Sequence, residues 1–267
     1  MRGSSLAATL LLAGALAAGC ASPTERFDAR AATLTLERGT VPGEGFTHVV
    51  YRRPGATAAR VLHVYLDGDG RPWDGRAPAA DPTPHEPLTL RLLALDPAPA
   101  VYLGRPCYHG TAATPPCAPA LWTDARYSDA VVASLAAAAR NLAAAGRHRE
   151  IVWVGYGGGG TLAMLAAARA PETTGVVTIA ANLDVEGWTR RHGQPALAAS
   201  LSPATQPPLP AAIRQRHYVG ARDTVVLPAI VSGGGIPAGS LTVVPDYDHV
   251  CCWIDLWPRV LAELGRR

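Results

Sequence analysis

The sequence EIVWVGYGGGGTLAMLAAARA, residues 150–170, is the strongest indication of the fold. A short apolar run leads into the glycine-rich turn GYGGGG at 155–160, and a segment of helical character follows directly. A strand, a tight glycine turn and a helix in this order are typical of turns that hold a ligand or a catalytic group at the end of a parallel strand. Three known motifs share this outline, and each needs different side chains.

Segments with strand and helix patterns alternate along the chain around this turn. We expect strands at 32–39, 46–54, 60–66, 100–106, 150–154, 175–181, 214–220 and 239–245, and helices at 87–97, 128–146, 160–169 and 250–267, with an irregular segment of about 30 residues after 181. This alternation predicts an α/β fold with a mostly parallel, doubly wound sheet and helices on both faces. The first two strands, joined by a short turn, should be antiparallel at one edge.

The N-terminal segment predicts export. Residues 1–19 have a basic start and an apolar run ending in small residues, which indicates a signal peptide. The sequence AAGC makes Cys20 a candidate for lipid attachment, although Ala17 stands where Leu is commonest in a lipobox. An ordinary signal peptide with a chance cysteine is the alternative. Ala21 is typical of lipoproteins sent to the outer membrane, so we expect a lipid-anchored protein on its periplasmic face, with a tether at 20–31 and one domain at 32–267.

Composition excludes several classes of function. The hydrophobic fraction of 48% is ample for a core, and the net charge of +3 is small. The basic residues are all Arg, and no basic stripe with interleaved aromatics appears, so we expect no nucleic-acid partner. We expect no cofactor, and no Cys/His spacing matches a zinc site.

The remaining cysteines fall into two pairs. Cys107 and Cys117 lie in a Pro-rich loop of an exported protein, which predicts a disulfide between them. Cys251 and Cys252 are adjacent, and the sequence leaves open whether they are buried thiols or a vicinal disulfide.

Two of the three motifs at the turn are dinucleotide and phosphate loops. Gly155, Gly157 and Gly160 satisfy G-x-G-x-x-G, and Asp184 follows the next strand, where a ribose-binding carboxylate would lie. However, this motif usually follows the first strand of the fold, and a run of four glycines easily matches it by chance. The phosphate loop G-x-x-x-x-G-K-[ST] fails because the chain has no Lys.

The third motif is the nucleophile elbow G-x-S-x-G, with Gly157 at the serine position. Its partners follow in the expected order, with Asp223 after one strand as the acid and His249 after the last strand as the base. The turn LDGDG, which includes Gly68 and Asp69, and the N–H of the residue after the elbow, Gly158, are candidates for an oxyanion hole. Asp223 as a plain turn residue, and His249 bonded to a backbone carbonyl, are the alternatives.

Other polar and aromatic residues near the strand ends have two interpretations each. Arg105 and Arg126 can pair with acids in a loop-rich cap or bind a ligand carboxylate, and we favour structural pairing. Trp73, Trp122 and Trp188 can line an apolar pocket or pack within such a cap.

The strings YLDGDG, DPTP, YLGRPC, LWTDARYS, VGYGGGG, ANLD, YVGARDTVV and DYDHVCCW together resemble a family of bacterial α/β-hydrolase-fold lipoproteins. The resemblance covers roughly residues 45–257. It implies a serine-hydrolase scaffold with Asp223 as the triad acid and His249 as the triad base, but no particular substrate. The family normally reads VGYSGGG at the elbow, and Gly157 departs from it.

Glycine has no nucleophilic side chain, so an acyl-enzyme cannot form at Gly157. We therefore expect an ester- or acyl-hydrolase scaffold, with a small ester-like ligand, whose activity is lost or severely weakened. A non-catalytic envelope protein that binds a ligand or partner in the old pocket is the alternative, and a dinucleotide-binding enzyme is a weaker one.

Overall fold

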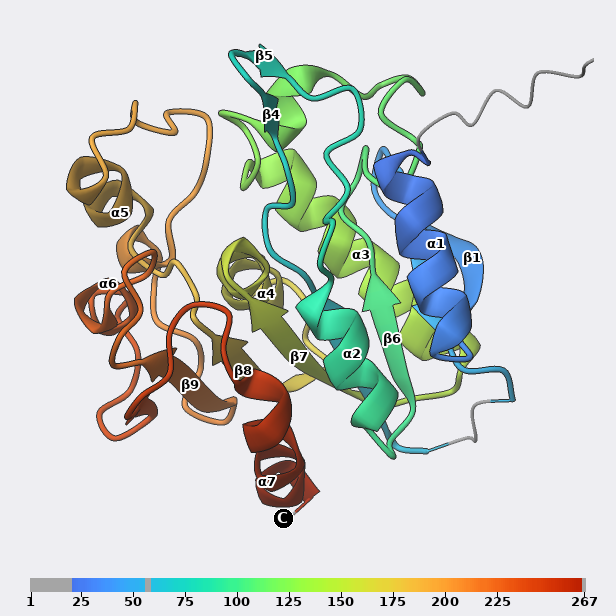
Figure 1. Cartoon of the computed structure of the whole chain (residues 1–267). Helices are drawn as coiled ribbons and strands as arrows, with labels where there is room; N and C mark the ends of the chain where they lie inside the picture. Colours follow the sequence, from blue (N-terminus) through green and yellow to red (C-terminus); the bar gives the residue numbers. More distant parts are fainter. Residues whose placement is uncertain (1–20, 56–58, 266–267) are drawn as a thin grey trace, which may run out of the picture.

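An eight-stranded mixed sheet runs through the molecule, and helices cover both of its faces (Figure 1). The computed structural model describes residues 21–55 and 59–265. The strands are β1 (Glu37–Pro42), β2 (Thr47–Arg52), β3 (Val61–Leu66), β6 (Ala100–Leu103), β7 (Glu150–Tyr156), β8 (Thr173–Ile179), β9 (Arg214–Gly220) and β10 (Leu241–Val244). Their order is β1-β2-β6-β3-β7-β8-β9-β10. The pairs β1–β2 and β2–β6 are antiparallel and all others are parallel, which confirms the predicted sheet and its antiparallel edge.

The helices divide into two layers. One face carries α1 (Pro23–Thr33), α2 (Leu88–Leu95) and α7 (Trp253–Gly265), and the other carries α3 (Asp129–Ala145), α4 (Gly158–Ala167), α5 (Val185–Arg191) and α6 (Pro228–Ser232). Alternation along β7 explains this: Trp153 packs with the α3 and α4 layer, and its neighbour Val154 packs with the α2 and α7 layer. Both side chains are fully buried because helices cover the sheet on each side.

Part of the expected tether is folded. From Pro23 onward the segment is the helix α1, which begins with a capping box between Ser22 and Glu25. Phe27 is only 2% exposed and packs against the rings of Tyr51 and Tyr102. The expectation of a tether over 20–31 is therefore wrong from Pro23 on, because an apolar side chain on the helix fixes it to the sheet. The signal peptide and Cys20 lie outside the described residues.

Two other expectations along the chain needed correction. The first strand occupies 37–42 rather than 32–39, because α1 takes its first two residues. The segment expected to be irregular contains α5 and a 3-10 turn, Pro203–Thr205. A second 3-10 turn, Pro119–Trp122, and a small hairpin of β4 (Trp73–Asp74) and β5 (Ala77–Pro78) lie in the loops. Within the described ranges, no helix is long and apolar enough to cross a membrane.

Both cysteine pairs are disulfides in the structure. Cys107 and Cys117 are joined, as predicted, and close the loop that precedes the 3-10 turn Pro119–Trp122. Cys251 and Cys252 are joined to each other, which resolves the alternative that the sequence left open. Cys251 is therefore not a free thiol beside His249.

Candidate active site

The glycine turn is a sharp elbow between β7 and α4. Gly157 has φ 53° and ψ −125°, a left-handed conformation that glycine adopts at little cost. Its N–H donates to the carbonyl of Ile179 on β8, and its own carbonyl accepts from the N–H of Gly160. The turn thus has the strained strand-to-helix geometry of a nucleophile elbow, at the carboxyl end of a central parallel strand.

The other glycines of the turn are explained by close packing. A Cβ at Gly155 would lie 2.4 Å from the carbonyl oxygen of Gly159, and one at Gly159 would lie 2.2 Å from the carbonyl oxygen of Leu66. A Cβ at Gly160 would lie 2.4 Å from the Cβ of Ala181. These contacts let α4 start tight against the ends of β3, β7 and β8. Close packing at Gly155 and Gly160, together with the positive φ of Gly157, therefore accounts for the G-x-G-x-x-G match.

Asp184, the carboxylate that a dinucleotide site needs, has a structural role. It is the N-cap of α5, and its Oδ1 accepts a hydrogen bond from the N–H of Gly187 at 2.9 Å. This interaction occupies the side chain without any ligand.

Asp223 and His249, which follow the carboxyl ends of β9 and β10, come together. Nδ1 of His249 lies 2.9 Å from Oδ2 of Asp223. Oδ1 of Asp223 accepts from the N–H groups of Val225 and Val226, at 2.8 and 2.7 Å. The Asp223 side chain is fully buried, whereas that of His249 is 20% exposed. The carboxylate thus accepts two backbone hydrogen bonds and a third from Nδ1–H of His249, and this third bond orients the imidazole ring.

The pair converges on the elbow. A Cβ built on Gly157 would lie 3.9 Å from Nε2 of His249 and 3.7 Å from the Cα of Gly68, and apart from its two chain neighbours no other described residue comes closer. The fold therefore brings Gly157, Asp223 and His249 together, with Nε2 of His249 facing the Cβ direction of Gly157.

Two aromatic residues that the sequence analysis did not predict hold the His249 loop. Nε1 of Trp253 donates to the backbone carbonyl of His249 at 2.9 Å, and the hydroxyl of Tyr156 donates to the same oxygen at 3.3 Å. The ring of Tyr156 also lies 5.2 Å from the imidazole. Tyr156 directly precedes the elbow, so this contact ties the base to the turn.

Asp69 is the centre of a polar network behind the elbow. Its carboxylate accepts from Arg105 at 2.7 Å, from Arg126 at 3.1 Å and from the hydroxyl of Tyr127 at 2.7 Å. Burial raises the pKa of Asp69, but the two guanidinium groups outweigh this and the net pKa lies below 3.8. A Cβ on Gly158 would meet this carboxylate at 2.1 Å. The favoured interpretation of Arg105 and Arg126 as structural partners is confirmed.

The predicted oxyanion donors differ in their availability. The N–H of Gly68 already donates to Oδ1 of Asp67 at 2.8 Å. Gly158 is the first residue of α4, so its N–H has no acceptor within the helix. Asp67 itself is buried, its Oδ2 has no hydrogen-bond partner among the described residues, and burial raises its pKa to about 6. Gly158 and Asp69 thus remain as candidate backbone donors.

A cavity of about 390 Å³ opens over the elbow. It is bounded by Gly157, Gly158, His249, Tyr156 and Trp188, with Asp67 and Asn182 also in its wall. Among its described lining residues there is no serine, threonine or cysteine. A larger hollow of about 780 Å³ shares Trp188 with it and is bordered by the exposed Trp73. Trp122, by contrast, packs with Cys107 and Tyr108 inside the loops.

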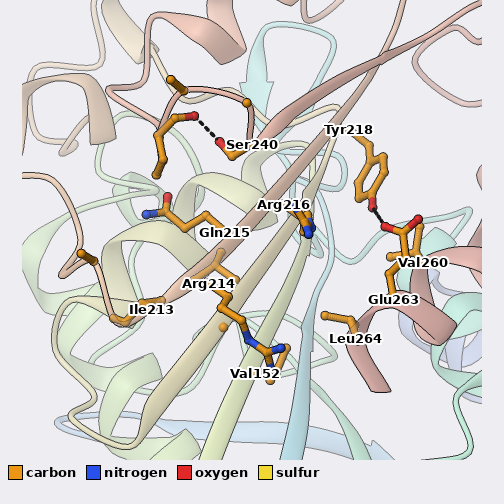
Figure 2. Close-up of a pocket in the computed structure, with 16 residues that line it drawn as sticks. Val152, Ile213, Arg214, Gln215, Arg216, Tyr218, Ser240, Val260, Glu263 and Leu264 are labelled. Carbon is orange, nitrogen blue, oxygen red and sulfur yellow. Dashed lines mark hydrogen bonds between the residues drawn. The ribbon is translucent and has the colours of Figure 1, made fainter. Parts of the chain in front are cut away.

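Another hollow, of about 340 Å³, lies between β9 and α7 (Figure 2). It begins near Val152 and Gly175, at the amino ends of β7 and β8, and the hydroxyl of Tyr218 donates to Glu263 across it. Ligands of parallel α/β sheets bind at the carboxyl ends of the strands, so the cavity over the elbow is the candidate site.

Solved structures share this fold. No protein-family model matches the sequence, and a search of curated proteins finds no similar protein. The structure of EstE5 soaked with ethyl alcohol is similar with a TM-score of 0.58 and 18% identity, over 94% of this chain and 93% of that one. A serine hydrolase without a lid from Xanthomonas campestris gives 0.55 and 17%, over 86% and 94%, and a Pyrobaculum calidifontis esterase gives 0.58 and 16%, over 90% of each. The chain has an α/β-hydrolase fold, with esterase-like structural neighbours.

Proposed function

We propose that this chain is an ester- or acyl-hydrolase scaffold in which Gly157 stands at the nucleophile position, so that hydrolysis through an acyl-enzyme is lost or severely weakened. The observation that carries the proposal is the position of the missing side chain. A Cβ on Gly157 would point into space 3.9 Å from Nε2 of His249, and the ring is oriented by the buried Asp223. A serine hydroxyl at this place would come within hydrogen-bonding reach of the base.

The proposal also places the protein at the outer membrane, held by a lipid on Cys20. The apolar N-terminal run and the small residues before Cys20 support lipid attachment at that cysteine, and Ala21 supports the outer membrane, periplasmic face, as the destination.

The alternative is a binding protein that uses the same pocket without chemistry. The cavity over the elbow and the larger hollow beside Trp73 share Trp188 in their walls, and such neighbouring hollows suit a small ligand with an apolar arm. In that case His249 contributes nothing beyond shape.

The experiment that tests the proposal restores the hydroxyl. Gly157→Ser places a serine in a left-handed conformation, which costs on the order of 1–3 kcal/mol, and should gain labelling by a fluorophosphonate probe together with hydrolysis of a small activated ester. Both gains should disappear in Gly157→Ser/His249→Ala, and the wild type should not be labelled. A folded Gly157→Ser protein that neither reacts with the probe nor cleaves the ester would refute the proposed triad geometry.

A further inference from the structure

Among the glycines of the turn, only Gly157 has free space at its Cβ position, and this space lies in front of His249. At Gly155, Gly158, Gly159 and Gly160 a Cβ would meet another atom at 2.1–2.4 Å, so the rest of the turn is filled by its neighbours. At Gly157 alone among these, the nearest atoms lie 3.7 and 3.9 Å away. The elbow therefore leaves room for a small group beside Nε2 of His249, within the cavity of about 390 Å³.

His249 is oriented so that the lone pair of Nε2 faces the space beside Gly157. Both oxygens of Asp223 act as acceptors, Oδ1 for two backbone N–H groups and Oδ2 for Nδ1 of His249. In the neutral ring the proton therefore resides on Nδ1, and Nε2 is an acceptor that points to the elbow. The hydrogen bonds of Trp253 and Tyr156 to the His249 carbonyl keep the loop in place.

We propose that a water molecule occupies this room and is the nucleophile, so that the chain hydrolyses activated esters directly, without an acyl-enzyme. This inference rests on the proposed function, because it uses the same dyad and the same cavity. The His249 side chain is 20% exposed, so solvent reaches the base. The described lining residues include no serine, threonine or cysteine that His249 could activate, and we therefore take water as the nucleophile.

The reaction balances with the groups at hand. As the water oxygen bonds to the ester carbonyl carbon, one water proton passes to Nε2 of His249, and the carbonyl electrons move onto the carbonyl oxygen. The N–H of Gly158, which has no acceptor within α4, lies at the elbow as a donor to that oxygen. When the tetrahedral adduct collapses, the bond to the alcohol oxygen breaks and the leaving group takes the proton from Nε2. Acid and alcohol depart, and the dyad is unchanged.

The substrate class follows from what the site lacks. No acyl-enzyme divides the hydrolysis into two easier half-reactions, so the expulsion of the alcohol must be easy. We therefore assign aryl esters and other esters of acidic alcohols, with a small acyl group at the elbow.

The test is hydrolysis of p-nitrophenyl acetate at neutral pH by the wild type and three variants. The chain contains no lysine, so acyl transfer to lysine side chains does not contribute to the signal. The wild type should exceed His249→Ala by about a hundredfold or more, as expected for loss of a general base. It should show no initial burst and no inhibition by a fluorophosphonate.

Gly157→Ala and Gly157→Ser form a matched pair, because both place a Cβ in the same left-handed conformation. The methyl group of Gly157→Ala encroaches on the room for the water beside Nε2 of His249, so its rate should fall at least tenfold below that of the wild type. Gly157→Ser should instead show a burst and become sensitive to the fluorophosphonate. A folded Gly157→Ala protein that retains the wild-type rate would overturn the inference.

A wild type no faster than His249→Ala would also overturn the inference. If Gly157→Ser is nevertheless labelled and active, the proposed function stands and only the water mechanism fails. If Gly157→Ser is folded and inert as well, both fail together.

Discussion

Replacement of Asp67 by asparagine tests how the fold tolerates a buried carboxylate next to the elbow. Burial raises the pKa of Asp67 from 3.8 to about 6, and its hydrogen bond from Gly68 and the charge of Arg105 offset this only in part. A carboxyl group with a raised pKa in the folded state contributes its full stability below its unfolded pKa and loses it as the pH rises through its folded pKa. The rise to about 6 corresponds to about 3 kcal/mol, at about 1.36 kcal/mol per pH unit.

Asparagine does not ionise, so the Asp67→Asn protein does not lose this stability as the pH rises. The free energy of unfolding of Asp67→Asn minus that of the wild type should therefore increase by about 3 kcal/mol between pH 3 and pH 7, mostly between pH 4 and pH 6. Urea unfolding followed by circular dichroism at several pH values measures it. Burial lowers the pKa of His48 and His217 to about 4 and that of His109 to about 3, which weakens both proteins in acid, and the subtraction removes this common effect.

Asp81→Asn is the matched control, because its effect has the opposite sign. Burial raises the pKa of Asp81, but hydrogen bonds from Thr83 and Thr24 outweigh it and the net pKa is lowered. Asp81 therefore stabilises the fold above its unfolded pKa, and its replacement should be most costly near neutral pH and least costly in acid. If the Asp67→Asn difference does not change with pH, the carboxylate is not the desolvated group described here.

Two further predictions concern the N-terminal region. Phe27→Ala should lower the free energy of unfolding by about 3–5 kcal/mol, because Phe27 anchors α1 to the sheet. Arg30→Ala, on the exposed side of α1, should change the free energy of unfolding by no more than about 0.5 kcal/mol. If thermal or urea unfolding shows equal, small effects for both variants, α1 is not packed against the sheet. In the native host, Cys20→Ala should yield soluble or unprocessed protein in membrane fractionation, and a variant that stays membrane-bound with normal processing would exclude lipid attachment at Cys20.

The sheet and its layers were predictable because they depend on local patterns. Period-two runs such as 46–54 and helical runs such as 128–146 report burial on one or both faces, and the alternation of the two fixes a parallel α/β sheet. Asp223 and His249 were predictable for a related reason: each follows a strand, and parallel strands end at the same edge of the sheet. The helix α1 carried a local signal too, the S-x-x-E capping box of Ser22 and Glu25, but its polar composition suggested a tether.

Contacts between distant loops were not predictable. The network that joins Asp69 to Arg105, Arg126 and Tyr127 connects residues 36 to 58 positions apart, and no local pattern encodes such a distance. The raised pKa of Asp67 depends on how completely α2 and the neighbouring strands exclude water from it, which is a property of packing rather than of the motif LDGDG.

The packing of α1 limits how far the domain can stand from a lipid surface. If Cys20 carries the lipid, only residues 20–22 separate the acyl chains from the first turn of a helix that is fixed to the sheet. Three extended residues span about 10 Å, so the domain has almost no reach and little freedom to reorient. A domain held in this way would stay next to the bilayer, and its orientation there would be set by the packing of α1 rather than by a flexible linker.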